Sequence, residues 1–165
     1  MNYAKIKYFC IANGPGVRTA LFVQGCPIHC KGCFNQDTWD FRGGKHFVKS
    51  TQREIFDSMN EHIAGLSILG GEPLVHWNEP DVTKLAKDFK QQFPDKTIWL
   101  WTGYEWDKVQ HSDIMQYIDV CVAGPYVEET RDLSLAYCGS RNQEVIDVKA
   151  TIKNGHKKVY YKEHK

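Results

Sequence analysis

Three of the six cysteines in this chain of 165 residues lie close together, as Cys26-x3-Cys30-x2-Cys33. Thiolates at such spacing are typical ligands of zinc or of an iron–sulfur cluster. A closed structural zinc site takes four protein ligands, and a cluster held only by protein takes four cysteines, so this local set is one ligand short. The spacing therefore predicts either a distant fourth ligand or an open coordination position for a small molecule.

Both alternatives remain open on the spacing alone. Three cysteines can bind three irons of a [4Fe–4S] cluster and leave the fourth iron free for a small-molecule ligand. A zinc knuckle would instead recruit His29, Cys10 or Cys138 as its fourth ligand. In either site, Gly25 and Gly32 would relieve crowding where the main chain passes close to the metal.

A second motif, Gly70-Gly71-Glu72-Pro73, directly follows the apolar run 66–69. Taken alone, it indicates a turn with a solvated glutamate. Beside a ligand it would do more, because glycines expose backbone carbonyls that accept hydrogen bonds from an ammonium group. Glu72 would then add negative charge or hold the loop.

The elements that position these motifs alternate along the chain. Apolar runs bounded by glycine-rich turns indicate strands, and apolar residues at three- and four-residue spacing indicate helices, the first opened by a capping-box pattern at Thr51 to Glu54. The sequence predicts strands at 4–11, 19–23, 66–69, 97–101 and 118–122, and helices at 51–63, 80–93 and 105–117.

This alternation predicts an α/β fold with a mostly parallel sheet and helical crossovers. Consecutive parallel strands point the same way, so the segments that follow them gather at one end of the sheet, where ligands bind. We therefore expect the cysteine loop (residues 25–35) to meet 70–73, 102–104 and 123–126.

Composition favours a single globular domain over residues 1–165, with 42% hydrophobic and 25% charged residues. A formal charge of +1 gives no field that would steer the chain toward nucleic acid or a membrane surface. Without a secretory pattern or an apolar run of membrane-spanning length, we expect a cytoplasmic protein whose clustered cysteines bind metal rather than form disulfides. Residues 149–165 are lysine-rich, and we expect a solvated basic C-terminal tail there.

The cysteine motif followed by Gly70-Gly71-Glu72-Pro73 resembles the radical S-adenosylmethionine (SAM) superfamily. The resemblance narrows to the activating proteins of anaerobic (class III) ribonucleotide reductase and covers nearly the whole chain, to about residue 148. It is carried by five further motifs in the same order: Asn13-Gly14-Pro15-Gly16-Val17-Arg18, Phe22-Val23-Gln24-Gly25-Cys26, Cys33-Phe34-Asn35, Trp99-Leu100-Trp101-Thr102-Gly103-Tyr104 and Gly139-Ser140-Arg141-Asn142-Gln143.

The resemblance implies a partial, open (βα) barrel that binds one [4Fe–4S] cluster and SAM. The reduced cluster would cleave SAM to methionine and a 5′-deoxyadenosyl radical, which removes a hydrogen from a glycine of the reductase and leaves a glycyl radical. Cys26, Cys30 and Cys33 would be the catalytic metal ligands, and the SAM-binding residues would be Phe34, Asn35, Gly70, Gly71, Glu72, Pro73 and Thr102.

The resemblance also implies two partners, the large subunit of anaerobic ribonucleotide reductase as protein substrate and a flavodoxin-type electron donor. Exposed parts of 35–48 and 127–144 are expected to dock the reductase. Alternative functions are another small radical SAM enzyme, either a different glycyl-radical activase or a deazapurine synthase, and a zinc-binding docking module. The chain departs from the family pattern at Ala123 and Pro125, where the family has an aspartate and a lysine.

Overall fold

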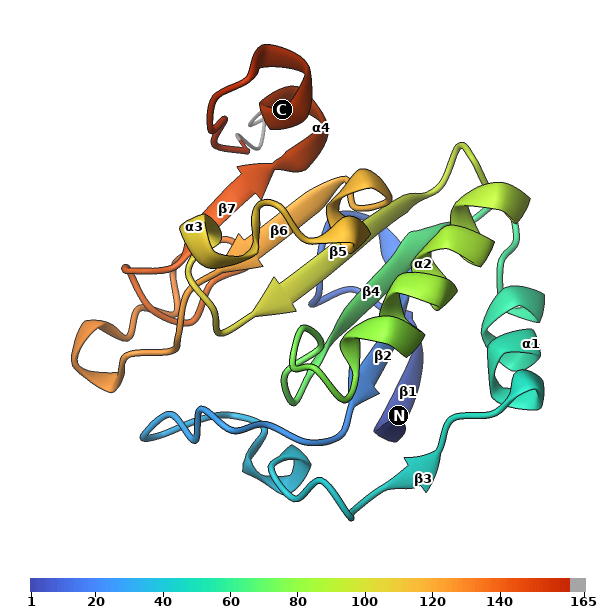
Figure 1. Cartoon of the computed structure of the whole chain (residues 1–165), viewed down its shortest axis with the longest axis horizontal. Coiled ribbons are helices and arrows are strands. Elements are labelled where there is room, and N and C mark those ends of the chain that lie inside the picture. The colour runs from blue at the N-terminus through green and yellow to red at the C-terminus, as the bar shows by residue number, and fades with distance from the viewer. Residues whose placement is uncertain (161–165) are drawn as a thin grey trace.

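The structure is a computed structural model of the whole chain, and residues 1–160 are described below. Its centre is a seven-stranded sheet with the order β3-β1-β2-β4-β5-β6-β7 (Figure 1). The strands are β1 (Asn2–Cys10), β2 (Val17–Val23), β3 (Lys45–His46), β4 (Ile63–Gly70), β5 (Thr97–Thr102), β6 (Val120–Ala123) and β7 (Glu144–Asp147). The helices are α1 (Lys49–Asp57), α2 (Glu79–Gln92), α3 (Trp106–Val109) and α4 (Val148–Asn154), with 3-10 turns at Gln36–Thr38, Asp113–Gln116 and Glu128–Thr130.

The four central strands, β2, β4, β5 and β6, run parallel, as the sequence predicts. β1 pairs antiparallel with both β2 and β3, and β7 pairs antiparallel with β6. The sheet is open, with β3 and β7 at its two edges, so it is not a closed barrel. We call the end at which β2, β4, β5 and β6 finish the C-terminal rim.

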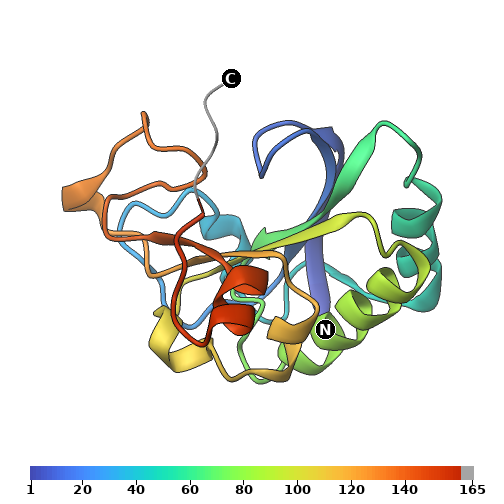
Figure 2. The same cartoon turned by 90° about the horizontal axis from the view of Figure 1, so that it is seen from above.

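The main core lies between the sheet and the helices on one of its faces. Leu21, Leu66 and Leu100 point from β2, β4 and β5 toward Ile55 of α1 and Phe89 of α2, and all five are fully buried. Figure 2 shows α1 and α2 together on this side, with the β1–β2 hairpin and several loops on the other. The helices α1 and α2 pack on this face of the sheet, and the C-terminal rim is formed by loops.

Two predicted helices differ from the structure. The first begins at Lys49, so Thr51 lies inside it and caps nothing, and it ends at Asp57 rather than at 63. Its end coincides with Ser58, whose hydroxyl donates to the Ile55 carbonyl at 2.6 Å and offers the backbone an alternative to the next helical bond. The helix predicted over 105–117 is broken at Ser112, which donates to Glu79 of α2 at 2.5 Å.

The predicted C-terminal tail is largely ordered structure instead. α4 is capped by the Asp147 side chain, which accepts from the Ala150 N–H, and it ends at Gly155 in the left-handed conformation. Val159 then forms a bridge to Ile146 of β7, so this segment packs on the sheet; residues 161–165 of the predicted tail lie outside the described residues. Among the helices of residues 1–160, none has the length and apolar character needed to cross a membrane.

Candidate functional site

The cysteine loop leaves β2 through a sharp turn and is held by the segment that follows it. Gly25 has φ +93° and its hydrogen faces the Phe41 ring, where a Cβ would lie 2.4 Å away. Its N–H donates to the Thr38 carbonyl at 2.8 Å, and the Cys26 N–H donates to the Trp39 carbonyl at 3.1 Å. The loop thus folds back on its own continuation, which fixes the direction in which the first cysteine points.

Each of the three clustered thiols accepts a backbone hydrogen bond. The Ile28 and His29 N–H groups donate to Cys26, the Tyr126 N–H donates to Cys30, and the Asn35 N–H lies 3.4 Å from the Cys33 sulfur. Burial raises the pKa of Cys26 and of Cys30, and these N–H groups oppose that rise. Hydrogen bonds to sulfur are one means by which proteins stabilise and tune cluster thiolates, so this donor set fits an iron–sulfur cluster.

The 70–73 segment lies directly against the cysteine loop. The Gly71 N–H donates to the Val23 carbonyl at 2.9 Å, and the Glu72 N–H donates to the Gly25 carbonyl at 2.8 Å. A Cβ on Gly71 would lie 2.5 Å from that Gly25 oxygen. Because only glycine permits this approach, the Gly-Gly pair places its backbone beside the first cysteine.

Glu72 holds the loop rather than projecting into solvent. Its carboxylate is 1% exposed and accepts from the Leu74 N–H at 2.9 Å, the Thr102 hydroxyl at 2.7 Å and the Gly103 N–H at 2.7 Å. Burial raises the pKa of Glu72 to about 7, although these three hydrogen bonds lower it. Of the two roles that the sequence left open, the geometry favours the structural one, a link between the ends of β4 and β5.

The segment after β5 completes this link. The Thr102 hydroxyl is used within the protein, since it donates to Glu72 and accepts from the Tyr104 N–H at 3.1 Å. A Cβ on Gly103 would lie 2.5 Å from the Ile28 side chain of the cysteine loop. The 102–104 turn therefore packs against both the Glu72 carboxylate and the cysteines' own loop.

The segment after β6 reaches the cysteine loop from the other side. The Tyr126 ring lies 5.1 Å from the Phe34 ring, and the Arg131 guanidinium lies 5.5 Å from the Phe34 centroid. A Cβ on Gly32 would be 2.0 Å from a Glu128 carboxylate oxygen. All four strand-end segments thus meet at the C-terminal rim, as the predicted topology requires, and Figure 1 shows the cysteine loop and the 127–143 region at this end of the sheet.

The structure also gives the positions of Phe34, Ala123 and Pro125. Phe34 is 59% exposed at the rim, although its ring contacts Tyr126 and Arg131. Ala123 is buried in the core, and the Pro125 carbonyl accepts from the Asn142 side chain at 2.7 Å. Asn78 is a residue that the sequence does not predict, since an asparagine before a helix carries no signal for such a contact. Its buried amide donates to the Gln24 and Glu72 carbonyls at 2.9 and 3.0 Å and holds the two loops together.

The cysteines outside the loop lie elsewhere. Cys10 pairs with Arg18 at the start of β2, the opposite end of that strand from the cysteine loop, and its thiol bonds to the Asn13 side chain at 3.2 Å. Cys121 is fully buried in the main core, and the Cys138 thiol lies 3.8 Å from the Gln143 carbonyl. Within residues 1–160, no three His, Cys, Asp or Glu side chains are grouped so as to hold one metal ion.

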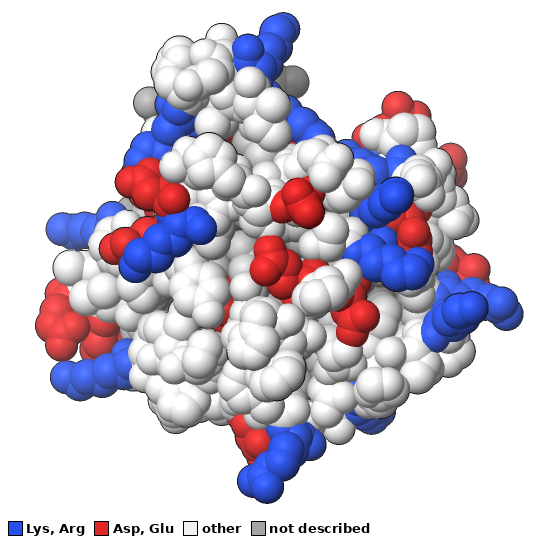
Figure 3. All heavy atoms as spheres, viewed as in Figure 1, with Lys and Arg blue, Asp and Glu red and all other residues white. Residues whose placement is uncertain are grey.

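Charges of both signs are interspersed on the surface seen in Figure 3. This distribution agrees with 21 Lys and Arg against 20 Asp and Glu in the whole chain. No large field of one sign therefore selects a partner on that face.

Comparison with known proteins identifies relatives across most of the chain. Residues 12–146 match a family model described as a 4Fe-4S single cluster domain. The anaerobic ribonucleoside-triphosphate reductase-activating protein of Enterobacteria phage T4 is 38% identical over 146 residues, 88% of this chain and 93% of that protein. The protein of the same name from Escherichia coli K12 is 39% identical over 150 residues, 88% of this chain and 97% of that protein, and the one from Vibrio cholerae is 38% identical over 150 residues.

Proposed function

The chain belongs to the family of anaerobic ribonucleoside-triphosphate reductase-activating proteins, and we propose that it generates the glycyl radical of anaerobic ribonucleotide reductase by reductive cleavage of SAM. The observation that carries the proposal is the cysteine loop, in which three thiols accept backbone N–H bonds at a rim built by four strand-end segments. We assign the open sheet to the partial barrel of the radical SAM type.

Cys26, Cys30 and Cys33 would hold three irons of a [4Fe–4S] cluster and leave the fourth open to SAM. The bound cluster supplies one electron, which cleaves SAM to methionine and the 5′-deoxyadenosyl radical that removes hydrogen from a glycine. The chain itself would hold the cluster and orient SAM beside it. The Ile28, Tyr126 and Asn35 N–H groups stabilise thiolate charge, and the rim segments fix where SAM lies relative to the cysteines.

Different rim residues would bind different parts of SAM. Gly70 and Gly71 lie beside the cysteine loop and would offer backbone oxygens to the methionyl ammonium group. The exposed face of Phe34 would pack against the adenine, next to Tyr126. Asn35 supports Cys33, while Glu72, Pro73 and Thr102 are buried and would act by holding the loop that carries the glycines.

The protein substrate would be the large subunit of the anaerobic reductase, and a flavodoxin-type protein would deliver the electron. We place the reductase on the exposed parts of 35–48 and 127–144, which adjoin the cysteine loop. These segments expose apolar side chains, among them Leu133, which is 73% exposed, and Phe41. Exposed apolar side chains next to a catalytic rim suit a transient docking surface.

Anaerobic reconstitution with iron and sulfide tests the proposal. We expect a brown protein with about four irons per chain that, with dithionite and SAM, yields 5′-deoxyadenosine and, with the anaerobic reductase, a glycyl-radical EPR doublet. A colourless protein with about one zinc and no iron would contradict it and support the zinc docking module. Cleavage of SAM without radical transfer to the reductase would instead indicate another glycyl-radical activase or a deazapurine synthase.

A further inference from the structure

One buried donor at the C-terminal rim has no partner. Among the buried side-chain nitrogen and oxygen atoms of residues 1–160, the indole Nε1 of Trp39 is the one that makes no hydrogen bond. Tryptophan N–H groups usually find a partner when they are buried. A buried donor without one calls for a specific explanation, and a redox role or a missing ion is among the accepted ones.

Trp39 contacts the cysteine loop through both its backbone and its side chain. Its carbonyl accepts the Cys26 N–H at 3.1 Å, so its backbone runs beside the first cysteine. Its indole ring stacks on the His29 imidazole, with centroids 4.5 Å apart and planes at 18°. His29 lies between Cys26 and Cys30 with φ +51°, and its N–H donates to the Cys26 sulfur.

The ring contact gives Trp39 a positioning role. A left-handed backbone is unfavourable for a residue other than glycine, and it persists only where surrounding contacts enforce it. The stacked indole holds the His29 ring, and the His29 N–H in turn bonds the sulfur of Cys26. Stacking alone, however, would not require a donor at the indole nitrogen, because phenylalanine would stack equally well.

We propose that the Trp39 indole N–H is a hydrogen-bond donor to a sulfur atom of the [4Fe–4S] cluster, and that it raises the reduction potential of that cluster. The inference rests on the proposed function, since it requires the cluster on Cys26, Cys30 and Cys33. A bound cluster would supply the acceptor that the Trp39 N–H lacks, because thiolate and sulfide sulfurs accept hydrogen bonds. Such hydrogen bonds to sulfur help to set the reduction potential of the cluster. A donor at sulfur favours the reduced cluster, which carries one more electron and therefore more negative charge.

The chain contains a matched pair of tryptophans for the test. Trp77 also lies against a histidine, His76, with ring centroids 4.2 Å apart, but it is 64% exposed. Trp39→Phe keeps a stacking ring and removes the N–H, and Trp77→Phe makes the same change where no effect is expected. Wild type and both variants are reconstituted anaerobically, and iron, sulfide and the EPR-monitored midpoint potential of the one-electron couple are measured.

We expect all three proteins to bind the cluster, with a lower midpoint potential in Trp39→Phe and an unchanged one in Trp77→Phe. Equal potentials in Trp39→Phe and wild type, at equal iron content, would overturn the inference while leaving the proposed function intact. Failure of the wild type itself to bind iron would overturn the proposed function instead.

A second measurement does not depend on the folding of a variant. Wild-type protein made with tryptophan labelled with ¹⁵N in the indole ring, reconstituted and reduced with dithionite, should show a ¹⁵N coupling to the cluster spin in pulsed EPR. Trp77→Phe should retain this coupling. A wild-type cluster without any indole ¹⁵N coupling would overturn the inference, and would indicate that the buried N–H bonds to water.

Discussion

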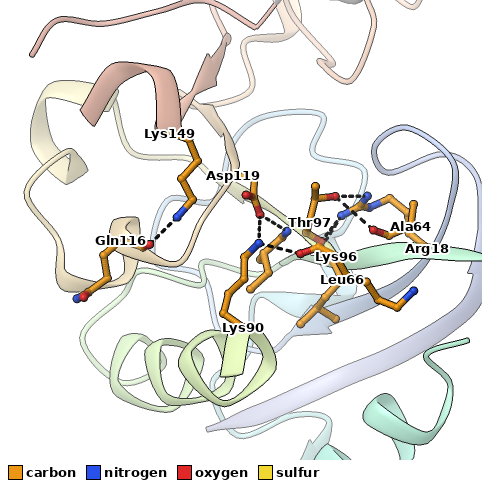
Figure 4. Close-up of polar contacts among 10 residues, drawn as sticks. Arg18, Ala64, Leu66, Lys90, Lys96, Thr97, Gln116, Asp119 and Lys149 are labelled. Carbon is orange, nitrogen blue, oxygen red and sulfur yellow. Dashed lines mark hydrogen bonds and ion pairs between the residues drawn. The ribbon is translucent and has the colours of Figure 1, made fainter. Parts of the chain in front are cut away.

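The two ends of the parallel sheet treat polar groups in opposite ways. At the end where the strands begin, Arg18 is fully buried, and its guanidinium makes five hydrogen bonds, to the oxygens of Ser67, Pro15, Leu66 and Thr97. Figure 4 shows those to Leu66 and Thr97. Five is the full number of donors that an arginine carries. Burial lowers the pKa of Arg18 to about 10, so the group remains charged at neutral pH.

The neighbours of Arg18 at this end, which we call the N-terminal rim, are satisfied in the same way. Asp119 accepts from the Ile98 N–H at 2.7 Å and pairs with Lys90 at 2.8 Å. Lys96 donates to the Ile63 carbonyl at 2.5 Å, and Lys149 donates to the Gln116 carbonyl at 2.6 Å. These polar groups bind one another, and their role is stability.

At the C-terminal rim, the indole N–H of Trp39 has no hydrogen-bond partner within residues 1–160, and the three cysteine thiols, which accept backbone N–H groups, would bind iron in the proposed site. The same strands end there, so the backbone topology cannot be the cause of the difference. The difference comes from the residue types, because the cysteine spacing and the paired glycines bring sulfur atoms and unhindered backbone together at this rim. The internally bonded charges of the N-terminal rim therefore serve stability, whereas the thiols and the unpartnered indole N–H lie at the end where we propose the ligand site.

The largest expected effect comes from the cysteine loop. Cys30→Ala should remove a cluster ligand and reduce production of 5′-deoxyadenosine to the background of the protein-free reaction, with iron content falling in parallel. Cys121→Ala is the matched control, because Cys121 is buried in the core away from the rim. It should cost about 1–2 kcal/mol of stability and retain cleavage; a cleaving Cys30→Ala protein would remove Cys30 from the ligand set.

The N-terminal rim should respond in stability alone. Arg18→Met leaves buried oxygens without their donors and should lower the free energy of unfolding of the apoprotein by about 2–4 kcal/mol, measured by urea denaturation. The dissociation constant of SAM for the reconstituted variant should stay that of wild type. Arg42→Met, which alters a 93% exposed arginine, should change neither quantity. Weaker SAM binding in Arg18→Met with unchanged stability would contradict the division between the two rims.

The sequence predicts that the four strand-end segments meet at one end of the sheet, and the structure confirms this, but it does not predict every contact that holds them together. Spacing at Cys26, Cys30 and Cys33 is a local property, and parallel order follows from alternating elements, so both could be predicted. The contacts of Trp39 and Asn78 could not be predicted, because each acts through a contact that only the folded chain creates.

The helix ends were missed for a related reason. Ser58 and Ser112 interrupt helical patterns through side-chain hydrogen bonds, and such bonds compete with the backbone only once their partners are in place. The antiparallel pairing of β7 with β6 likewise depends on the fold, and the sequence pattern predicts no strand at 144–147.

Protonation of Glu72, at the C-terminal rim, should make the stability of the folded protein depend on pH. Burial, with a further contribution from Glu79, raises its folded-state pKa to about 7 from the ordinary 4.5. The folded state therefore binds more protons than the unfolded state between these values. This proton binding stabilises the folded state by about 3 kcal/mol below pH 4.5, and the stabilisation is lost as the pH rises from 4.5 to 7.

The thermal midpoint of the apoprotein, measured from pH 5 to 8.5, tests this expectation. Glu72→Gln removes the titrating group, so the difference between wild type and variant should change with pH below 7 and become constant above it. Glu61→Gln, at a glutamate that is 85% exposed, should parallel wild type throughout. A constant difference between wild type and Glu72→Gln over the whole range would show that Glu72 titrates normally.

The smallest expected effect isolates one bond of this link. Thr102→Val keeps the shape of the side chain and removes the hydroxyl that donates to Glu72 at 2.7 Å, which should cost about 1 kcal/mol of stability at pH 8. Because that hydroxyl favours the ionised carboxylate, its loss raises the Glu72 pKa further, and the pH range over which stability declines moves upward. Thr102→Ser retains the donor and should restore the wild-type profile. If valine and serine behave alike, the Gly103 N–H is the hydrogen bond from Glu72 that joins the β4 and β5 ends, and the Thr102 hydroxyl contributes nothing to the rim.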